Sequence, residues 1–277
     1  MKRNTIIAVV LGLLVVGGAF FYFNCPLLNP REEVVEEAKL QPLRTHLQMK
    51  KWKNKACEGD TLECARVSVQ FLRFSDSIRP DAARRMNDTI EILIRRSLNI
   101  SELTNESFTI DQLAQQFLDD YDKENADYPS YPWNMDITTD LVYQTPKLVS
   151  IAVGFSSYMG GAHPNSEVKY HNYRTDTGKE LSLEDITTDF DQLLIIAEKS
   201  FRLANDIKDN ETFFDKGFEM DSLFVLTRNF AINKDGLDFL YNPYEIAPYS
   251  MGTIEFSIPY EELEGVLREE FIVGDGE

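Results

Sequence analysis

Residues 154–165 read GFSSYMGGAHPN, and residues 166–173 continue the chain as SEVKYHNY. Apolar residues on both sides of this loop predict two strands. Gly160, Gly161 and Pro164 lie between them, and glycine adopts backbone angles that other residues resist, so the loop can bend sharply. We therefore interpret the stretch as a hairpin whose loop presents side chains to a partner.

The periodicity of the flanking sequence extends this hairpin into a sheet with helices. Val67, Val69 and Phe71 alternate with polar residues, which is typical of a half-buried strand. The residues Asn-Lys-Asp-Gly at 233–236 are a strong hairpin signal. Strands are predicted over residues 65–74, 134–143, 148–158, 167–173, 224–232, 237–241 and 253–258, and helices over 81–98, 110–123, 190–201 and 259–267. This pattern favours an α+β fold with an antiparallel sheet packed by helices.

The chain of 277 residues is strongly acidic, with 28 basic against 46 acidic residues and a net charge of −18. Such a surface repels nucleic acid and attracts cationic partners, so a nucleic-acid ligand is not expected. The alternative is that the charge serves solubility alone. Hydrophobic residues make up 43% of the sequence and the aromatics are mostly Tyr and Phe, which indicates an ordered globular domain.

The N-terminal residues predict a membrane anchor. Lys2 and Arg3 precede an uncharged, mostly apolar run over residues 6–23, which as a helix is about 27 Å long, close to the hydrocarbon thickness of a bilayer. The positive-inside rule then places the bulk of the chain outside the cytoplasm, in the periplasm or at the exterior of a bacterial envelope. A cleaved signal peptide and a lipoprotein modified at Cys25 are the alternatives.

The predicted organisation has four parts, namely an anchor or signal segment over 1–25, a charged stalk over 26–56, and two globular parts packed together over 57–157 and 158–277. Cys57 and Cys64 lie close together at the start of the first globular part, a spacing that a small disulfide-closed loop can span. Two free thiols are the alternative. A zinc site is not expected, because the chain has three cysteines and no second pair.

Two longer stretches carry a resemblance to a known family. The first comprises YMGGAHPN at residues 158–165, Tyr173, and TGKELSLEDI at residues 177–186. The second comprises GLDFLYNPYEIAPY at residues 236–249, Gly252, and IPY at residues 258–260. They resemble the bacterial domain of unknown function 3298, the extracytoplasmic part of RsiV-type anti-sigma factors. Residues 64–158 are similar, more weakly, to the companion PdaC-type domain of unknown function 4163.

This resemblance implies an α+β domain outside the cytoplasmic membrane, with no established catalytic activity and no cofactor. In RsiV-type proteins the region is a receptor for lysozyme, so the implied ligand is a lysozyme-like cationic protein. Those proteins carry a sigma-binding segment before the membrane span, whereas only Met1–Thr5 precede it here, so a sigma-regulatory role is not implied. By resemblance the candidate ligand-binding residues are Tyr158, Gly160, Gly161, His163, Pro164, Tyr244, Glu245 and Tyr249.

The second of these loops also has a physical reason to act as a contact surface. Pro243 and Pro248 restrict the backbone beside Tyr244 and Tyr249, and rigid loops that carry tyrosine lose little conformational entropy on binding. The alternative is that these tyrosines pack the loop onto its own sheet, with their hydroxyls bonded to backbone.

Catalysis is the competing interpretation. His163 and His171 would share a face of one regular strand, and Asp176 or Glu180 would complete a metal site or orient a base. No HExxH, GxSxG or phosphate loop supports this, and the acids at residues 119–124 lack EF-hand spacing and fit a solvated helix end. We therefore expect a non-enzymatic binding domain without a metal site, whose ligand is a cationic protein or a cell-wall glycan. The alternative is a peptidoglycan- or glycan-acting enzyme or its accessory domain.

Overall fold

The computed structural model describes residues 41–55, 57, 64–99, 108–127, 131–220 and 223–272. All elements described below lie in the compact unit Pro42–Glu277. Among the described residues, no helix combines the length and the apolar character needed to cross a bilayer. The predicted span at residues 6–23 and Cys25 lie outside the described residues.

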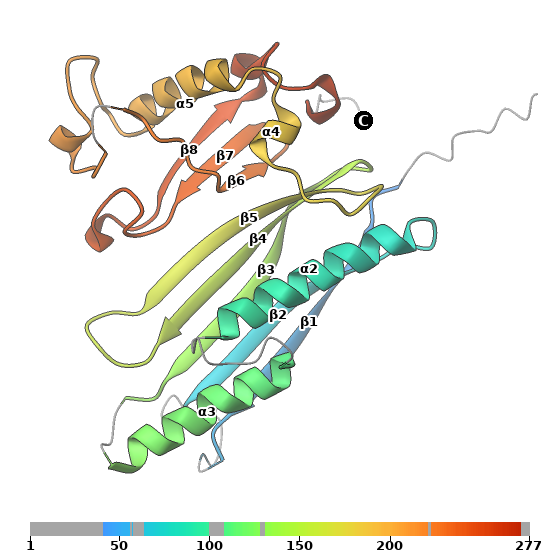
Figure 1. Cartoon of the computed structure of the whole chain (residues 1–277), viewed down its shortest axis with the longest axis vertical. Coiled ribbons are helices and arrows are strands. Elements are labelled where there is room, and N and C mark those ends of the chain that lie inside the picture. Colours follow the sequence, from blue (N-terminus) through green and yellow to red (C-terminus); the bar gives the residue numbers. More distant parts are fainter. Residues whose placement is uncertain are drawn as a thin grey trace, which may run out of the picture. The chain divides into compact units, whose positions relative to one another are not determined.

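Five strands form the larger sheet (Figure 1). They are β1 (Arg44–Lys53), β2 (Arg66–Ser75), β3 (Asn134–Gln144), β4 (Leu148–Tyr158) and β5 (Asn165–Arg174), side by side in chain order. All neighbours are antiparallel except β2 and β3, which run parallel. The sheet is therefore mixed, and the prediction of an antiparallel sheet is wrong for this pair. The reason is that a helical crossover between β2 and β3 returns the chain to the end of the sheet where β2 began.

The crossover helices α2 (Pro80–Leu98) and α3 (Ile110–Asp127) cover one face of this sheet (Figure 1). Pro80 stands in the first turn of α2, where its missing N–H costs no helical hydrogen bond. The buried residues of α2 recur at helical spacing and pack against alternating side chains of β2. The resulting core includes Val67, Val69, Met86, Ile90, Ile94, Phe117, Met135 and Tyr173. The predicted strand and helix patterns therefore meet in one core.

A second core surrounds a three-stranded antiparallel sheet of β6 (Phe230–Ile232), β7 (Gly236–Tyr241) and β8 (Ile254–Pro259). The accompanying helices are α4 (Leu183–Ile186), α5 (Phe190–Ala204) and the 3-10 helices η1 (Phe214–Lys216), η2 (Tyr249–Met251), η3 (Tyr260–Leu263) and η4 (Glu269–Phe271). Phe201 of α5 meets the rings of Phe213, Phe218 and Phe256 edge-on. The α+β class is confirmed.

Several predicted boundaries differ from the structure. The predicted stalk over 26–56 contains β1, because an exposed edge strand of polar and cationic residues resembles a linker in sequence. The predicted boundary at 157–158 falls within the β4–β5 hairpin, so the two predicted parts share one sheet. The predicted strand over 224–232 shortens to β6. The predicted helix over 259–267 is only the 3-10 helix η3, because Glu264 leaves helical geometry with a ψ of 128° and Gly265 follows with a φ of +75°.

Cys57 and Cys64 form a disulfide in the connection between β1 and β2. Their Cα atoms are 5.7 Å apart, which lies in the usual range for such a bond. The disulfide therefore closes a short loop between the edge strand and its neighbour.

Asparagine side chains join the outer edge of β5 to the second sheet, and we call Asn172, Asn229 and Asn242 the asparagine seam. Asn229 accepts a hydrogen bond from Tyr170 N–H at 2.7 Å and donates to Val168 O at 2.8 Å. Asn242 accepts from Val168 N–H at 2.7 Å and donates to Val168 O at 3.0 Å. Backbone groups of an edge strand are thus paired with amide side chains in place of a sixth strand.

Asn172 makes the same kind of contact in the opposite direction, from β5 to the backbone of β6. Its Nδ2 donates to Phe230 O at 2.8 Å, and its Oδ1 accepts from Ile232 N–H at 2.9 Å. Ser150 Oγ also donates to this Oδ1. The Asn172 side chain is 1% exposed, so these bonds form away from water.

Candidate binding site

The hairpin loop between β4 and β5 is shaped by its glycines and by Tyr158. Gly160 and Gly161 have φ values of +95° and +107°, which glycine adopts without the strain that a Cβ would cause. Tyr158 Oη donates to Gly161 O at 3.1 Å and holds the start of the loop. His163 and Pro164 follow on the exposed side. The loop therefore has a defined shape that presents an imidazole.

The loop after β7 is anchored at its first residue and strained at its third. Asn242 belongs to the asparagine seam, and its N–H donates to Glu245 Oε2 at 3.0 Å. Tyr244 N–H donates to Ala247 O at 3.1 Å, yet Tyr244 has a φ of +72°, a left-handed conformation that is unfavourable for a large side chain. Backbone strain of this kind is concentrated at functional sites. The loop therefore holds Tyr244 in its position at an energetic cost.

The two loops meet in an aromatic cluster formed by His163, Tyr244 and Tyr249. The imidazole of His163 stacks on the Tyr249 ring, with centroids 3.7 Å apart and planes inclined by 16°. Tyr249 Oη donates to Pro164 O at 3.0 Å, and His163 Nδ1 lies 2.9 Å from the same oxygen. Because a carbonyl oxygen only accepts, Nδ1 carries a proton, and Nε2 lies 3.3 Å from Tyr244 Oη, within hydrogen-bonding distance. The three rings are therefore fixed relative to one another.

The aromatic cluster is accessible to a ligand. The Tyr244 side chain is 63% exposed, His163 is exposed, and Tyr249 is half-buried beneath them. The face of an aromatic ring attracts the guanidinium of arginine or the ammonium of lysine. The exposed rings of the cluster are therefore able to form cation–π contacts.

The structure gives the predicted ligand-binding residues two different roles. The ring contacts involve His163, Tyr244 and Tyr249, with Pro164 as the shared acceptor. The remaining residues shape the loops, namely Tyr158, Gly160, Gly161 and Glu245. The sequence analysis did not single out Asn242, although an Asn-Pro pair directly after a strand is a turn signal.

His171 belongs to a separate pair, in which the imidazole is mostly covered and the Glu180 carboxylate is half exposed. Its Nδ1 lies 2.6 Å from Glu180 Oε1, and 11% of its side chain is exposed. Among the described residues, His171 Nε2 and Tyr173 Oη are buried and have no hydrogen-bond partner, and burial raises the pKa of Tyr173. His163 and His171 are therefore engaged in different contacts. Within the described ranges, no group of three or more His, Cys, Asp and Glu side chains is placed to hold a metal ion.

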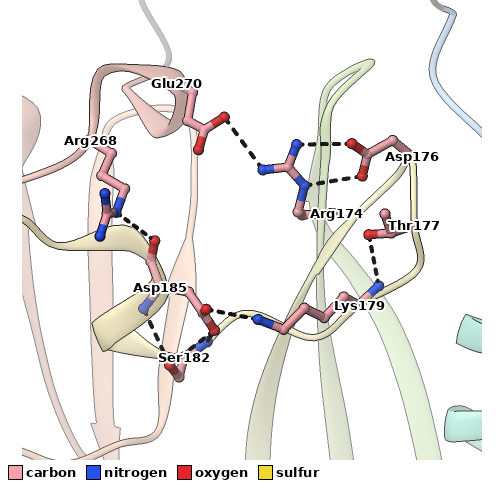
Figure 2. Close-up of polar contacts among 8 residues, drawn as sticks. All are labelled: Arg174, Asp176, Thr177, Lys179, Ser182, Asp185, Arg268 and Glu270. Carbon is pink, nitrogen blue, oxygen red and sulfur yellow. Dashed lines mark hydrogen bonds and ion pairs between the residues drawn. The ribbon is translucent and has the colours of Figure 1, made fainter.

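A salt-bridge cluster holds the end of β5 (Figure 2). Arg174 donates to both carboxylate oxygens of Asp176, at 3.1 and 2.9 Å, and reaches Glu270 at 3.4 Å. The side-chain hydrogen bond from Arg174 is the main cause of the lowered pKa of Asp176. Asp176 thus serves as an ion-pair partner of Arg174, and the structure does not bring it together with the two histidines.

A capping box begins α4 (Figure 2). Ser182 N–H donates to Asp185 Oδ2 at 3.0 Å, and Asp185 N–H donates back to Ser182 Oγ at 3.3 Å. Lys179 Nζ donates to Asp185 Oδ1 at 2.8 Å, and Arg268 donates to the Asp185 carbonyl at 2.9 Å. Lys179 first, and then the Ser182 N–H, lower the pKa of Asp185 to about 2.

Fold and site together define an α+β protein with a mixed five-stranded sheet, a three-stranded antiparallel sheet and an aromatic cluster on two loops. Residues 58–166 match the family model described as Deacetylase PdaC, and residues 180–261 match the one described as Protein of unknown function (DUF3298). The chain therefore joins a PdaC-type region to a DUF3298 region. The sequence motifs predicted both families in this order, so the resemblance is confirmed.

Similar proteins are found in several bacteria. A Mycobacterium tuberculosis protein named as an esterase is 25% identical over 174 residues, which are 55% of this chain and 73% of that protein. A crystal structure of a DUF3298 family protein from Pseudomonas aeruginosa PAO1 has a TM-score of 0.61 and 24% identity, over 85% of this chain and 99% of that chain. A crystal structure of a DUF3298 family member from Bacteroides fragilis NCTC 9343 has a TM-score of 0.66 and 19% identity, over 86% of this chain and 98% of that chain. These two structures share the fold.

Proposed function

We propose that this chain is a non-enzymatic binding protein of the bacterial cell envelope, held in the inner membrane through residues 6–23 with its globular part outside the cytoplasm. Its ligand surface is the aromatic cluster, and its ligand is a cationic protein of the lysozyme type. The observation that carries the proposal is the fixed and exposed arrangement of His163, Tyr244 and Tyr249 in a chain of net charge −18.

The aromatic cluster has the properties of a protein-contact surface. Its tyrosines are already ordered by hydrogen bonds, so little side-chain entropy is lost when a partner binds. The excess of acidic residues would speed the encounter with a cationic partner. The strain at Tyr244 supports a role for this side chain beyond folding, because glycine would adopt the same backbone conformation at lower cost.

The test is calorimetric titration of the full-length chain, in mild detergent, with a c-type lysozyme at two salt concentrations. We expect binding that weakens as salt rises, because exposed charges are screened. Tyr249→Ala removes the stack on His163 and should weaken binding at least tenfold, equivalent to about 1.4 kcal/mol. Tyr131→Ala is the matched control, since Tyr131 is 74% exposed and lies outside both loops; its affinity should equal that of the wild type.

Absence of binding at micromolar concentration would refute the lysozyme-type ligand. An equal loss of lysozyme affinity in Tyr249→Ala and Tyr131→Ala would refute the proposal that the ligand binds at the aromatic cluster. Salt-independent binding of peptidoglycan fragments that is lost in Tyr249→Ala would assign the aromatic cluster to a cell-wall glycan.

A second candidate function is hydrolysis of an acyl group on a cell-wall glycan, favoured by the esterase-named relative and by the match to Deacetylase PdaC. Glu180 orients the imidazole of His171 as a general base requires. However, His171 Nε2 is buried, and in the described part of the chain no hydroxyl lies within hydrogen-bonding distance of it. Turnover of an acetyl ester by the wild type, lost in a folded His171→Gln variant, would establish this function.

A further inference from the structure

β1 differs in charge from the rest of the chain. Its sequence, RTHLQMKKWK, contains one arginine and three lysines and no acid, although the chain carries a net charge of −18. β1 is also the outermost strand of the larger sheet, and no strand in the described ranges pairs with its outer edge. On that edge, every second residue directs its N–H and C=O away from β2. A cationic strand with unpaired backbone groups therefore borders the sheet.

The side chains of β1 present two distinct faces. On one face Trp52 packs against the core below α3, and Lys50 donates to Asp111 at 2.8 Å. On the other face Leu47 and Met49 are 54% and 55% exposed, and Lys51 continues the same face. The second face therefore combines exposed apolar area with positive charge.

Protection of the sheet edge explains only part of this pattern. Lysines on an edge strand oppose pairing with a second copy, because like charges would lie opposite each other. Protection does not require Leu47 and Met49, whose exposure adds apolar area to a strand edge. A partner that suits both features is an extended segment that carries apolar residues and, on the same face, an acidic residue for Lys51.

We propose that β1 is a docking strand for an extended acidic polypeptide segment of another protein. The segment adds a sixth strand to the sheet and forms backbone hydrogen bonds along the free edge of β1. Its apolar side chains cover Leu47 and Met49, and a carboxylate on the same face pairs with Lys51. This surface lies on β1, whereas the aromatic cluster lies on the loops after β4 and β7, so the two proposals fail or succeed independently.

The test uses a fluorescent capped peptide in which one face carries valines beside Leu47 and Met49 and a glutamate beside Lys51, with threonines on the other face. It is titrated with the full-length chain in mild detergent and followed by anisotropy. We expect saturable binding that Lys51→Glu weakens at least tenfold, and that Leu47→Ser weakens severalfold through loss of apolar contact. Lys234→Glu is the matched control, because Lys234 is equally a surface lysine but lies in the β6–β7 turn; it should bind like the wild type. Circular dichroism of each variant confirms folding.

A second peptide separates strand addition from simple charge attraction. N-methylation at alternate residues removes the backbone donors that face β1 and keeps every charge, so it should weaken binding at least tenfold. Equal affinity of the methylated peptide, or unchanged affinity in Lys51→Glu, would overturn the proposal. Binding to phosphatidylglycerol vesicles without peptide binding would overturn it in favour of a membrane surface, and a dimer abolished by Lys51→Glu would overturn it in favour of self-association.

Discussion

Replacing Asn172 by alanine tests whether the asparagine seam holds the two sheets together. The alanine side chain can neither donate to Phe230 O nor accept from Ile232 N–H, the two bonds through which Asn172 reaches β6. Phe230 and Ile232 are 4% and 0% exposed, so water cannot replace the lost partner. The variant therefore leaves two buried backbone groups unsatisfied.

The expected loss of stability follows from these two unsatisfied backbone groups. A buried polar group without a partner costs about 1–3 kcal/mol, so Asn172→Ala should lower the free energy of unfolding by about 2–6 kcal/mol. The total free energy of unfolding of a folded domain is about 5–15 kcal/mol, so this loss is a large fraction of the stability. Ser150→Ala is the control, because it removes only the hydroxyl that donates to Asn172 Oδ1 and leaves both bonds to β6 in place. Its cost should be about 1 kcal/mol.

Urea denaturation, followed by tryptophan fluorescence and by circular dichroism, measures both losses. Trp52 and Trp133 are the two tryptophans of the chain, and both pack in the core of the larger sheet. Fluorescence therefore reports on the core of the larger sheet alone, whereas circular dichroism reports on the secondary structure around both cores. In the wild type the two transitions should coincide, and in Asn172→Ala they should separate. A loss below about 1 kcal/mol, or a loss equal to that of Ser150→Ala, would refute the reasoning.

Three further predictions concern single sites. The pKa of Asp185 is lowered to about 2, so its carboxylate adds stability above about pH 4 that is lost as the pH falls toward 2; Asp185→Asn should lower the melting temperature at pH 7, and the difference from the wild type should vanish near pH 2. Tyr244→Gly relieves the positive φ and should raise the free energy of unfolding by about 0.5 kcal/mol in urea titrations, while calorimetry shows weaker ligand binding. Replacing Cys57 and Cys64 by serine should lower the free energy of unfolding by about 2 kcal/mol, because the open connection gains entropy when unfolded; unchanged urea midpoints after reduction of the wild type would contradict this.

Local sequence patterns predict the elements that bury one face. The alternation over residues 65–74 corresponds to β2, and the helical spacing after Pro80 corresponds to α2. In both cases the apolar period fixes which side chains face the core, so a short window of sequence contains the information. The capping box at Ser182 is predictable for the same reason, since its two partners lie within one helical turn.

No comparable local pattern in the sequence shows which distant strands pair, or in which direction. β2 and β3 run parallel because two helices separate them, but either strand alone would suit an antiparallel neighbour equally well. β1 is missed because it buries little besides Trp52 and gains its order from pairing with β2. The end of η3 shows the opposite case, in which a local turn at Glu264 and Gly265 stops a helix that Pro259 and the following acids favour.

The candidate site depends on contacts of this distant kind. The resemblance names the loops, but the contact between His163 and Tyr244 joins residues 81 positions apart, and no pattern within either loop specifies which ring lies opposite. The relative position of the two loops depends on Asn242, which begins the second loop and binds both backbone groups of Val168 on β5. The first loop leads directly into β5, so fixing Val168 fixes the distance between the loops. The residues that position this surface therefore lie on a strand edge, where asparagine side chains replace a missing strand.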